Sequence, residues 1–163
     1  MTPGIPFTTL LRYTDGEMRR WHAWLKEQPP SILDEPIGEG KLATLRGLLV
    51  HIFAVELRYA ERLLGEPVSS YDSLPADNLD VIFGIGVEAR RKLVGFLETG
   101  PDLDRVLTFE TLTAGARSAS ARKVVIHSIV HGIRHWAQIA TVLRERGYPA
   151  QWFHDILLSD ALP

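Results

Sequence analysis

The pattern of hydrophobic and polar residues predicts four long helices. Apolar side chains recur at steps of three and four over residues 7–28, 42–64 and 78–98, and again from Ser118 or Ser120 to about residue 146, which is the period of an amphipathic helix. Proline or glycine residues that stop helices follow every stretch. Because no central sheet is indicated, we expect an all-α fold, a four-helix bundle.

Two less regular segments complete the chain. Residues 105–120 alternate between apolar and polar side chains and are rich in threonine, which predicts an irregular connection or short hairpin before the last long helix. This segment is also a candidate lid or rim for a pocket. The tail that begins at residue 150 is predicted to form a short C-terminal helix. A chain of 163 residues is long enough for one sizeable core, so a single domain over residues 1–163 is expected.

Composition and charge exclude several classes of function. The chain is 45% hydrophobic and 23% charged with a net charge of -2, so it lacks the basic field that predicts direct nucleic-acid binding. It has no cysteine, which excludes disulfides, thiolate metal ligands and a cysteine nucleophile. No secretory signal pattern opens the sequence and no apolar run is long enough for a bilayer. We therefore expect a cytoplasmic protein without a membrane partner.

Three histidines lie at a spacing of four on the last predicted helix: His127, His131 and His135. A step of four residues turns a helix by about 400°, so successive rings lie nearly above one another, about 6 Å apart along the axis. Two adjacent histidines could share one metal ion, but the outer two would be about 12 Å apart in rise alone. The spacing leaves two pairs open, His127 with His131 or His131 with His135.

A metal site is favoured over packed histidines. A lone histidine on an apolar helix face is usually a packed side chain, but three on one stripe bring several buried nitrogens that need partners. One divalent ion can serve several of these nitrogens at once. His51 lies on the inward stripe of the second helix, whereas Glu56 is about 140° round that helix from His51 and is a poor co-ligand.

The remaining charged residues on the helices are interpreted as solvated surface. The residues in question are Glu56, Arg58, Glu61 and Arg62 on the second helix, and Glu88, Arg90, Arg91 and Lys92 on the third. Trp21 and Trp24 on the first helix fit either the core or an exposed interface, and the core is favoured because aromatic side chains are usually buried.

The two histidine-bearing stretches resemble the DinB-like (DinB/YfiT-like) superfamily. His51 is followed by IFAVE, and HSIVHGIRHWAQIATVLRERGYP comes late in the chain. The resemblance implies a four-helix bundle with a three-histidine metal centre, whose ligands here are His51, His131 and His135. It implies a supporting or packing role beside the ligands for His127, and Gln138 also matches the family pattern.

The resemblance also implies a cofactor and partners. These are a divalent transition metal (zinc first, nickel or manganese as alternatives), a homodimer and, in some branches of the family, a low-molecular-weight thiol. For the dimer surface we expect Trp21, Trp24 and the apolar tail. Three imidazoles on zinc would leave a fourth position for water or a substrate thiolate.

Three hypotheses for function follow. The first is a metal-dependent enzyme, with thiol S-transfer favoured over hydrolysis. The second is a non-catalytic metal-binding or stress-response module. The third is a helical interaction domain whose histidines are structural. Metal content separates the third hypothesis from the first two, and turnover of a thiol separates those two from each other.

Overall fold

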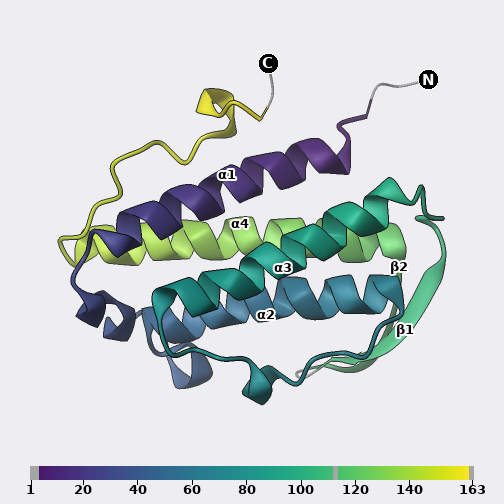
Figure 1. Cartoon of the computed structure of the whole chain (residues 1–163), viewed down its shortest axis with the longest axis horizontal. Helices are drawn as coiled ribbons and strands as arrows, with labels where there is room; N and C mark the ends of the chain where they lie inside the picture. Colours follow the sequence, from purple (N-terminus) through teal and green to yellow (C-terminus); the bar gives the residue numbers. More distant parts are fainter. Residues whose placement is uncertain (1–3, 112–113, 162–163) are drawn as a thin grey trace.

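Four long helices lie side by side in the computed structural model, which describes residues 4–111 and 114–161. They are α1 (Phe7–Lys26), α2 (Leu45–Leu64), α3 (Leu79–Glu98) and α4 (Ala121–Glu145) (Figure 1). The predicted four-helix bundle is confirmed, and each helix begins and ends within a few residues of its expected bounds. Helix α2 packs against both α3 and α4, and α1 packs against the same two helices. Within the described part of the chain, no helix combines the length and apolar character needed to cross a membrane.

Polar caps and one glycine fix several helix ends. Thr44, Asn78 and Ser120 each accept a hydrogen bond on their side chain from a backbone N–H three residues further along. Such a cap satisfies one of the N–H groups that the first turn leaves without a partner. Ser120, and not Ser118, therefore begins the histidine helix. At the end of α2, Gly65 has φ 72°, a left-handed conformation that glycine adopts without steric cost.

The connection before α4 is a hairpin. Strands β1 (Val106–Thr111) and β2 (Gly115–Ser120) pair antiparallel, with Val106 opposite Ser120. Of the two forms expected from the sequence, an irregular connection or a short hairpin, the structure shows the hairpin. Residues 112–113, which belong to the predicted connection, lie outside the described residues.

The tail lies along α1 (Figure 1). A buried carboxylate on α1 fixes the tail there. Glu17 is 4% exposed and hydrogen-bonds to Nδ1 of His154 at 2.6 Å and to Nε1 of Trp152 at 3.3 Å. The predicted C-terminal helix is a single 3₁₀ turn, Ile156–Leu158. The rest of the tail is held by these side-chain contacts and by a hydrogen bond from the Tyr13 hydroxyl to the carbonyl of His154.

The paired tryptophans of α1 belong to the core, as favoured above. Trp21 is fully buried and Trp24 is 8% exposed. Trp21 stacks against Trp136 of α4 at a centroid distance of 5.8 Å and against the ring of His154 at 5.3 Å. Because both tryptophans are covered within one chain, they are not available as a dimer surface.

The interpretation of Glu56 and Arg90 as solvated surface is wrong. Both are buried, and the Arg90 guanidinium donates to the Glu56 carboxylate through Nη2 at 2.9 Å and Nε at 3.1 Å. Arg90 also donates to Thr14 Oγ1 on α1. A buried charge is tolerated when a partner of opposite charge and further hydrogen bonds replace water. The pair therefore joins α2 to α3, and through Thr14 it joins both to α1.

Glu61 is a second carboxylate that was expected at the surface and is buried. Its two oxygens accept hydrogen bonds from the backbone N–H of Ser69 at 2.8 Å and from the Ser69 hydroxyl at 2.6 Å. These bonds replace the water that the carboxylate loses on burial. They also fasten the loop after α2 against the helix that carries His51.

Two glycines let the helices approach one another closely. A Cβ on Gly86 of α3 would lie 2.5 Å from the ring of Phe53, and one on Gly132 of α4 would lie 2.8 Å from Oε1 of Glu56. Any larger residue would need the neighbour to move. The approach of α2 to α4 at Gly132 matters for function, because His131 is the next residue along α4.

Candidate metal centre

Three imidazoles from two helices meet between α2 and α4. His51 comes from α2, while His131 and His135 lie one turn apart on α4. One ring nitrogen of each lies within 4.8 Å of the others, and the Nε2 atoms of His51 and His131 are 3.0 Å apart. At these separations one ion could contact all three rings.

The local helix geometry explains this meeting. The step of four on α4 places the rings of His131 and His135 with centroids 4.5 Å apart. The ring of His51 faces them from α2 at 4.8 and 5.1 Å. Of the two pairs that the spacing left open, the structure joins His131 and His135 to His51. These three residues are called the histidine group below.

The histidine group is neutral at physiological pH. Burial, and to a smaller extent the neighbouring imidazoles, lowers the pKa of His131 to about 3 and that of His51 to about 4. Burial also lowers the pKa of His135, although its hydrogen bond to Gln138 acts in the opposite direction. A neutral imidazole keeps a lone pair on one nitrogen, which is the form that binds a metal.

Gln138 orients His135. Nδ1 of His135 donates to the side-chain oxygen of Gln138 over 3.0 Å, because that oxygen can only accept a hydrogen bond. Since a neutral imidazole has a single N–H, the lone pair of His135 is then on Nε2. Metal-binding histidines are held in this way by a partner on their other nitrogen.

His127 lies outside the histidine group. Its ring centroid is 5.5 Å from that of His131, and it meets the ring of Tyr59 edge-on at 5.1 Å. It is exposed and lines the pocket described below. The structure thus places it beside the group, in contact with the ring of one member.

The donor set fits a divalent transition metal. Three neutral imidazoles are ligands that zinc, nickel and similar ions accept. Nδ1 of His131 is buried and has no hydrogen-bond partner among the described residues. A proton shared between His51 and His131 would give both facing Nε2 atoms a partner, but it would leave Nε2 of His135 without one. A metal ion bound by all three rings would be a partner for each of them.

The histidine group opens into a pocket of about 400 Å³, a size typical of small-molecule sites. Tyr59, Tyr71 and Val55 contribute its less polar wall, and the hairpin contributes Thr111 and Ala114. Part of the segment expected to form a rim therefore does line the pocket. Burial raises the pKa of Tyr71 to about 12, so its phenol is uncharged at neutral pH.

Arg58, Arg62 and Arg134 also line this pocket. The interpretation of Arg58 and Arg62 as outer surface is wrong, because both are half-buried and share the face of α2 that carries His51. A signal for this was present in the sequence. The two arginines follow His51 by seven and eleven residues, steps that return to the same side of a helix.

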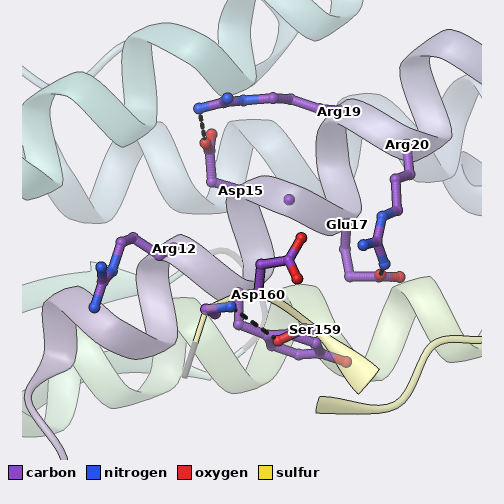
Figure 2. Close-up of a pocket in the computed structure, with 10 residues that line it drawn as sticks. Arg12, Asp15, Glu17, Arg19, Arg20, Ser159 and Asp160 are labelled. Carbon is purple, nitrogen blue, oxygen red and sulfur yellow. Dashed lines mark hydrogen bonds and ion pairs between the residues drawn. The ribbon is translucent and has the colours of Figure 1, made fainter. Parts of the chain in front are cut away.

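A second hollow, of about 270 Å³, lies between α1 and the tail (Figure 2). Its charges are balanced internally, since Arg19 pairs with Asp15 and Arg20 approaches Glu17 at 3.5 Å. Among the described residues, its lining contains no histidine. The pocket beside the histidine group is therefore the stronger candidate for chemistry.

Comparison with known proteins agrees with the helical fold. The model of the DinB family matches residues 4–161, which is nearly the whole chain. The matched range includes all four helices, the hairpin and the histidine group. No curated protein matches the chain.

Proposed function

The chain belongs to the DinB family, and from that premise we propose that it is a metal-dependent enzyme that transfers a small thiol to an electrophile. The observation that carries the proposal is the meeting of three neutral imidazoles at an open pocket. A closed set of four protein ligands is typical of a structural site, whereas three leave room for a reactant.

His51, His131 and His135 would hold the ion, with Gln138 keeping His135 in the required tautomer. When bound, a divalent ion supplies Lewis acidity that lowers the pKa of a thiol, so that the thiolate is present at neutral pH. Zinc is our first choice of ion, with nickel or manganese as alternatives. The thiol must come from a small molecule, because the chain has no cysteine.

The pocket would orient the two reactants. Val55, Tyr59 and Tyr71 offer apolar and aromatic surface to an organic electrophile, and the protonated Tyr71 hydroxyl can donate a hydrogen bond. In the transfer, sulfur forms a bond to the electrophilic carbon and the leaving group departs with the electron pair. The thiol proton passes to solvent through the open side of the pocket. A free thiol as co-substrate fits a reducing cytoplasm, which is where we propose that the protein acts.

A test is to load the protein with zinc, nickel or manganese and to offer each form a panel of thiols. Suitable thiols are glutathione, bacillithiol, mycothiol and coenzyme A, with monochlorobimane as the electrophile. We expect thiol-dependent turnover above the uncatalysed rate, which His131→Ala abolishes. If metal binds stoichiometrically but no thiol in the panel reacts, the non-catalytic metal-binding or stress-response module becomes the better account. One observation favours that second candidate: the described pocket lining includes no carboxylate that could accept a proton.

A further inference from the structure

The pocket beside the histidine group carries an excess of positive charge. Three guanidinium groups line it, those of Arg58, Arg62 and Arg134, and the described lining includes no aspartate or glutamate. We infer that the pocket selects a thiol that bears a carboxylate, and that Arg134 binds this carboxylate. The inference rests on the proposed function, since it names the class of thiol that the same site would use.

Elsewhere in the chain, arginines commonly face carboxylates. Arg46 pairs with Asp34 and Arg122 with Asp104, and the second hollow pairs Arg19 with Asp15 (Figure 2). These pairs leave little net charge at their sites. The pocket beside the histidine group departs from this arrangement, which indicates that its positive charge serves a ligand.

Two of the three guanidiniums are fixed by neutral groups. Arg58 donates to the backbone carbonyl of Ser69, and Arg62 donates to that of Glu110 over 3.1 Å. Arg62 also lies over the rings of Tyr59 and Phe109, each 5.2 Å from its guanidinium carbon. A carbonyl oxygen accepts a hydrogen bond but does not neutralise the cation. Both arginines therefore hold a positive field at the pocket in a fixed geometry.

Arg134 is the member of the trio that is free to bind. It is exposed and makes no hydrogen bond or ion pair with any described residue. It lies between His131 and His135 in sequence, and all three residues line the same pocket. One ligand in this pocket could therefore reach both Arg134 and the histidine group. The planar fork of a guanidinium matches the two oxygens of a carboxylate.

The size and lining of the pocket limit the ligand further. About 400 Å³ accommodates a small molecule but not a folded partner. A ligand would place its sulfur at the histidine group and its carboxylate at Arg134. Because both positions line one small pocket, the shortest ligands that meet both requirements are small mercaptocarboxylates. Larger carboxylate-bearing thiols belong to the same class.

The test compares two thiols that differ in charge and little in size, 3-mercaptopropionate and 3-mercaptopropionamide. The protein is loaded with cobalt, whose visible absorption reports what binds at the metal without requiring turnover. We expect the acid to bind about tenfold more tightly than the amide or better, as a charge-assisted hydrogen bond would produce. Arg134→Gln should remove most of this preference. Arg144→Gln is the matched control, because Arg144 is exposed on the same helix and outside the pocket.

The outcomes separate this inference from the proposed function. Equal affinity for the two thiols in the unmodified protein would overturn the inference and leave thiol binding at the metal intact. A preference that survives in Arg134→Gln would overturn the role of Arg134. If neither thiol changes the absorption of stoichiometrically bound cobalt, both the inference and the proposed function fail.

Discussion

Nε2 of His51 lies 3.0 Å from Nε2 of His131, although the two residues are 80 positions apart in sequence and belong to different helices. The two helices can approach this closely because residue 132 is a glycine: a Cβ at that position would meet the carboxylate of Glu56. Two imidazole nitrogens at this distance must share a proton or a metal ion. Because His135 completes the group within 4.8 Å, an ion accounts for all three positions.

Gln138 should tune the affinity of the site for metal. Gln138→Leu removes the acceptor for Nδ1–H of His135, and loss of such a partner typically weakens metal binding by about 10- to 100-fold. We expect this decrease in metal affinity, while the number of ions bound per chain at saturating metal stays unchanged. Gln138→Glu keeps an acceptor and should retain tight binding. Competition with a chromophoric chelator measures both, and equal weakening by the two substitutions would contradict a role as hydrogen-bond acceptor.

The buried pair of Glu56 and Arg90 should show strong coupling. Arg90→Leu leaves the Glu56 carboxylate buried without its partner, which should lower the free energy of unfolding by about 3–5 kcal/mol. The double substitution Glu56→Leu with Arg90→Leu should be far less destabilising, because no charge is left in the core. Arg91→Leu is the control and should leave stability almost unchanged, since Arg91 pairs with Glu88 at the surface. Denaturant unfolding of the unmodified protein and these three variants would contradict this account if the double substitution were at least as destabilising as Arg90→Leu alone.

The metal-free protein should lose stability as the pH falls below about 6.5. His51 and His131 have folded-state pKa values of about 4 and about 3, below the unfolded value of about 6.5. Below about pH 6.5 the unfolded chain therefore binds protons at these two histidines, whereas the folded chain does not. The contribution of the two histidines to stability is full above about pH 6.5 and is lost as the pH falls towards about 4. Each histidine should lower the free energy of unfolding by at most about 1.4 kcal/mol for each unit by which the pH falls in this range.

Urea unfolding in the presence of a chelator would measure this dependence. The control is a double variant, His51→Gln with His131→Gln, which removes these two titrating groups while the carboxylates and the other histidines remain. We expect a shallower decline of stability with falling pH in the variant. Identical slopes for the two proteins would contradict the shifted pKa values.

The sequence predicts those parts of the fold and site that depend on local order. Apolar periodicity and stop residues fix the helices, and a step of four fixes the neighbouring rings of His131 and His135. Which pair on α4 joins the group, and whether His51 belongs to it, depend on how α2 packs against α4. The spacing of residues within one helix carries no information about that packing. His51 was indicated by the family resemblance, with its inward position on α2 as support.

Charged residues show the limit of the same reasoning. A helical pattern assigns Glu56 and Arg90 to the surface because either charge alone would be costly in the core. Their burial depends on each other, across 34 positions and two helices. Arg58 and Arg62 are different, since their spacing from His51 places them on the pocket face of α2. That signal is available from the sequence once a charged residue is allowed to face a polar pocket.

We propose that the chain forms a homodimer, through a different surface from the tryptophan surface expected from the sequence. Trp21 and Trp24 are buried within the chain, whereas Ile126, Val130 and Ile133 form an exposed apolar stripe on α4. Steps of four and three keep the stripe on one helix face, and such exposed patches often mark interfaces. The exposed side chains of the tail, with Leu157 at 84%, are a further candidate.

Sedimentation velocity at micromolar concentration tests the stripe. We expect a dimer that Val130→Glu dissociates. Val87→Glu is the matched control, because Val87 is an equally exposed valine on α3 (59% against 54%) and lies outside the stripe. A monomer for the unmodified protein, or equal dissociation by both substitutions, would rule out this interface.

Metal content tests the central claim most directly. The protein purified without a histidine tag should contain about one divalent ion per chain, because three imidazoles form a single group. His131→Ala removes the ring at the centre of that group and should lose the ion. His127→Ala is the control: its ring lies one turn away, outside the group, and the ion should remain. Elemental analysis of the three proteins decides the matter: loss of metal in His131→Ala alone is the predicted result, and a His131→Ala protein that retains as much metal as its parent would contradict the account.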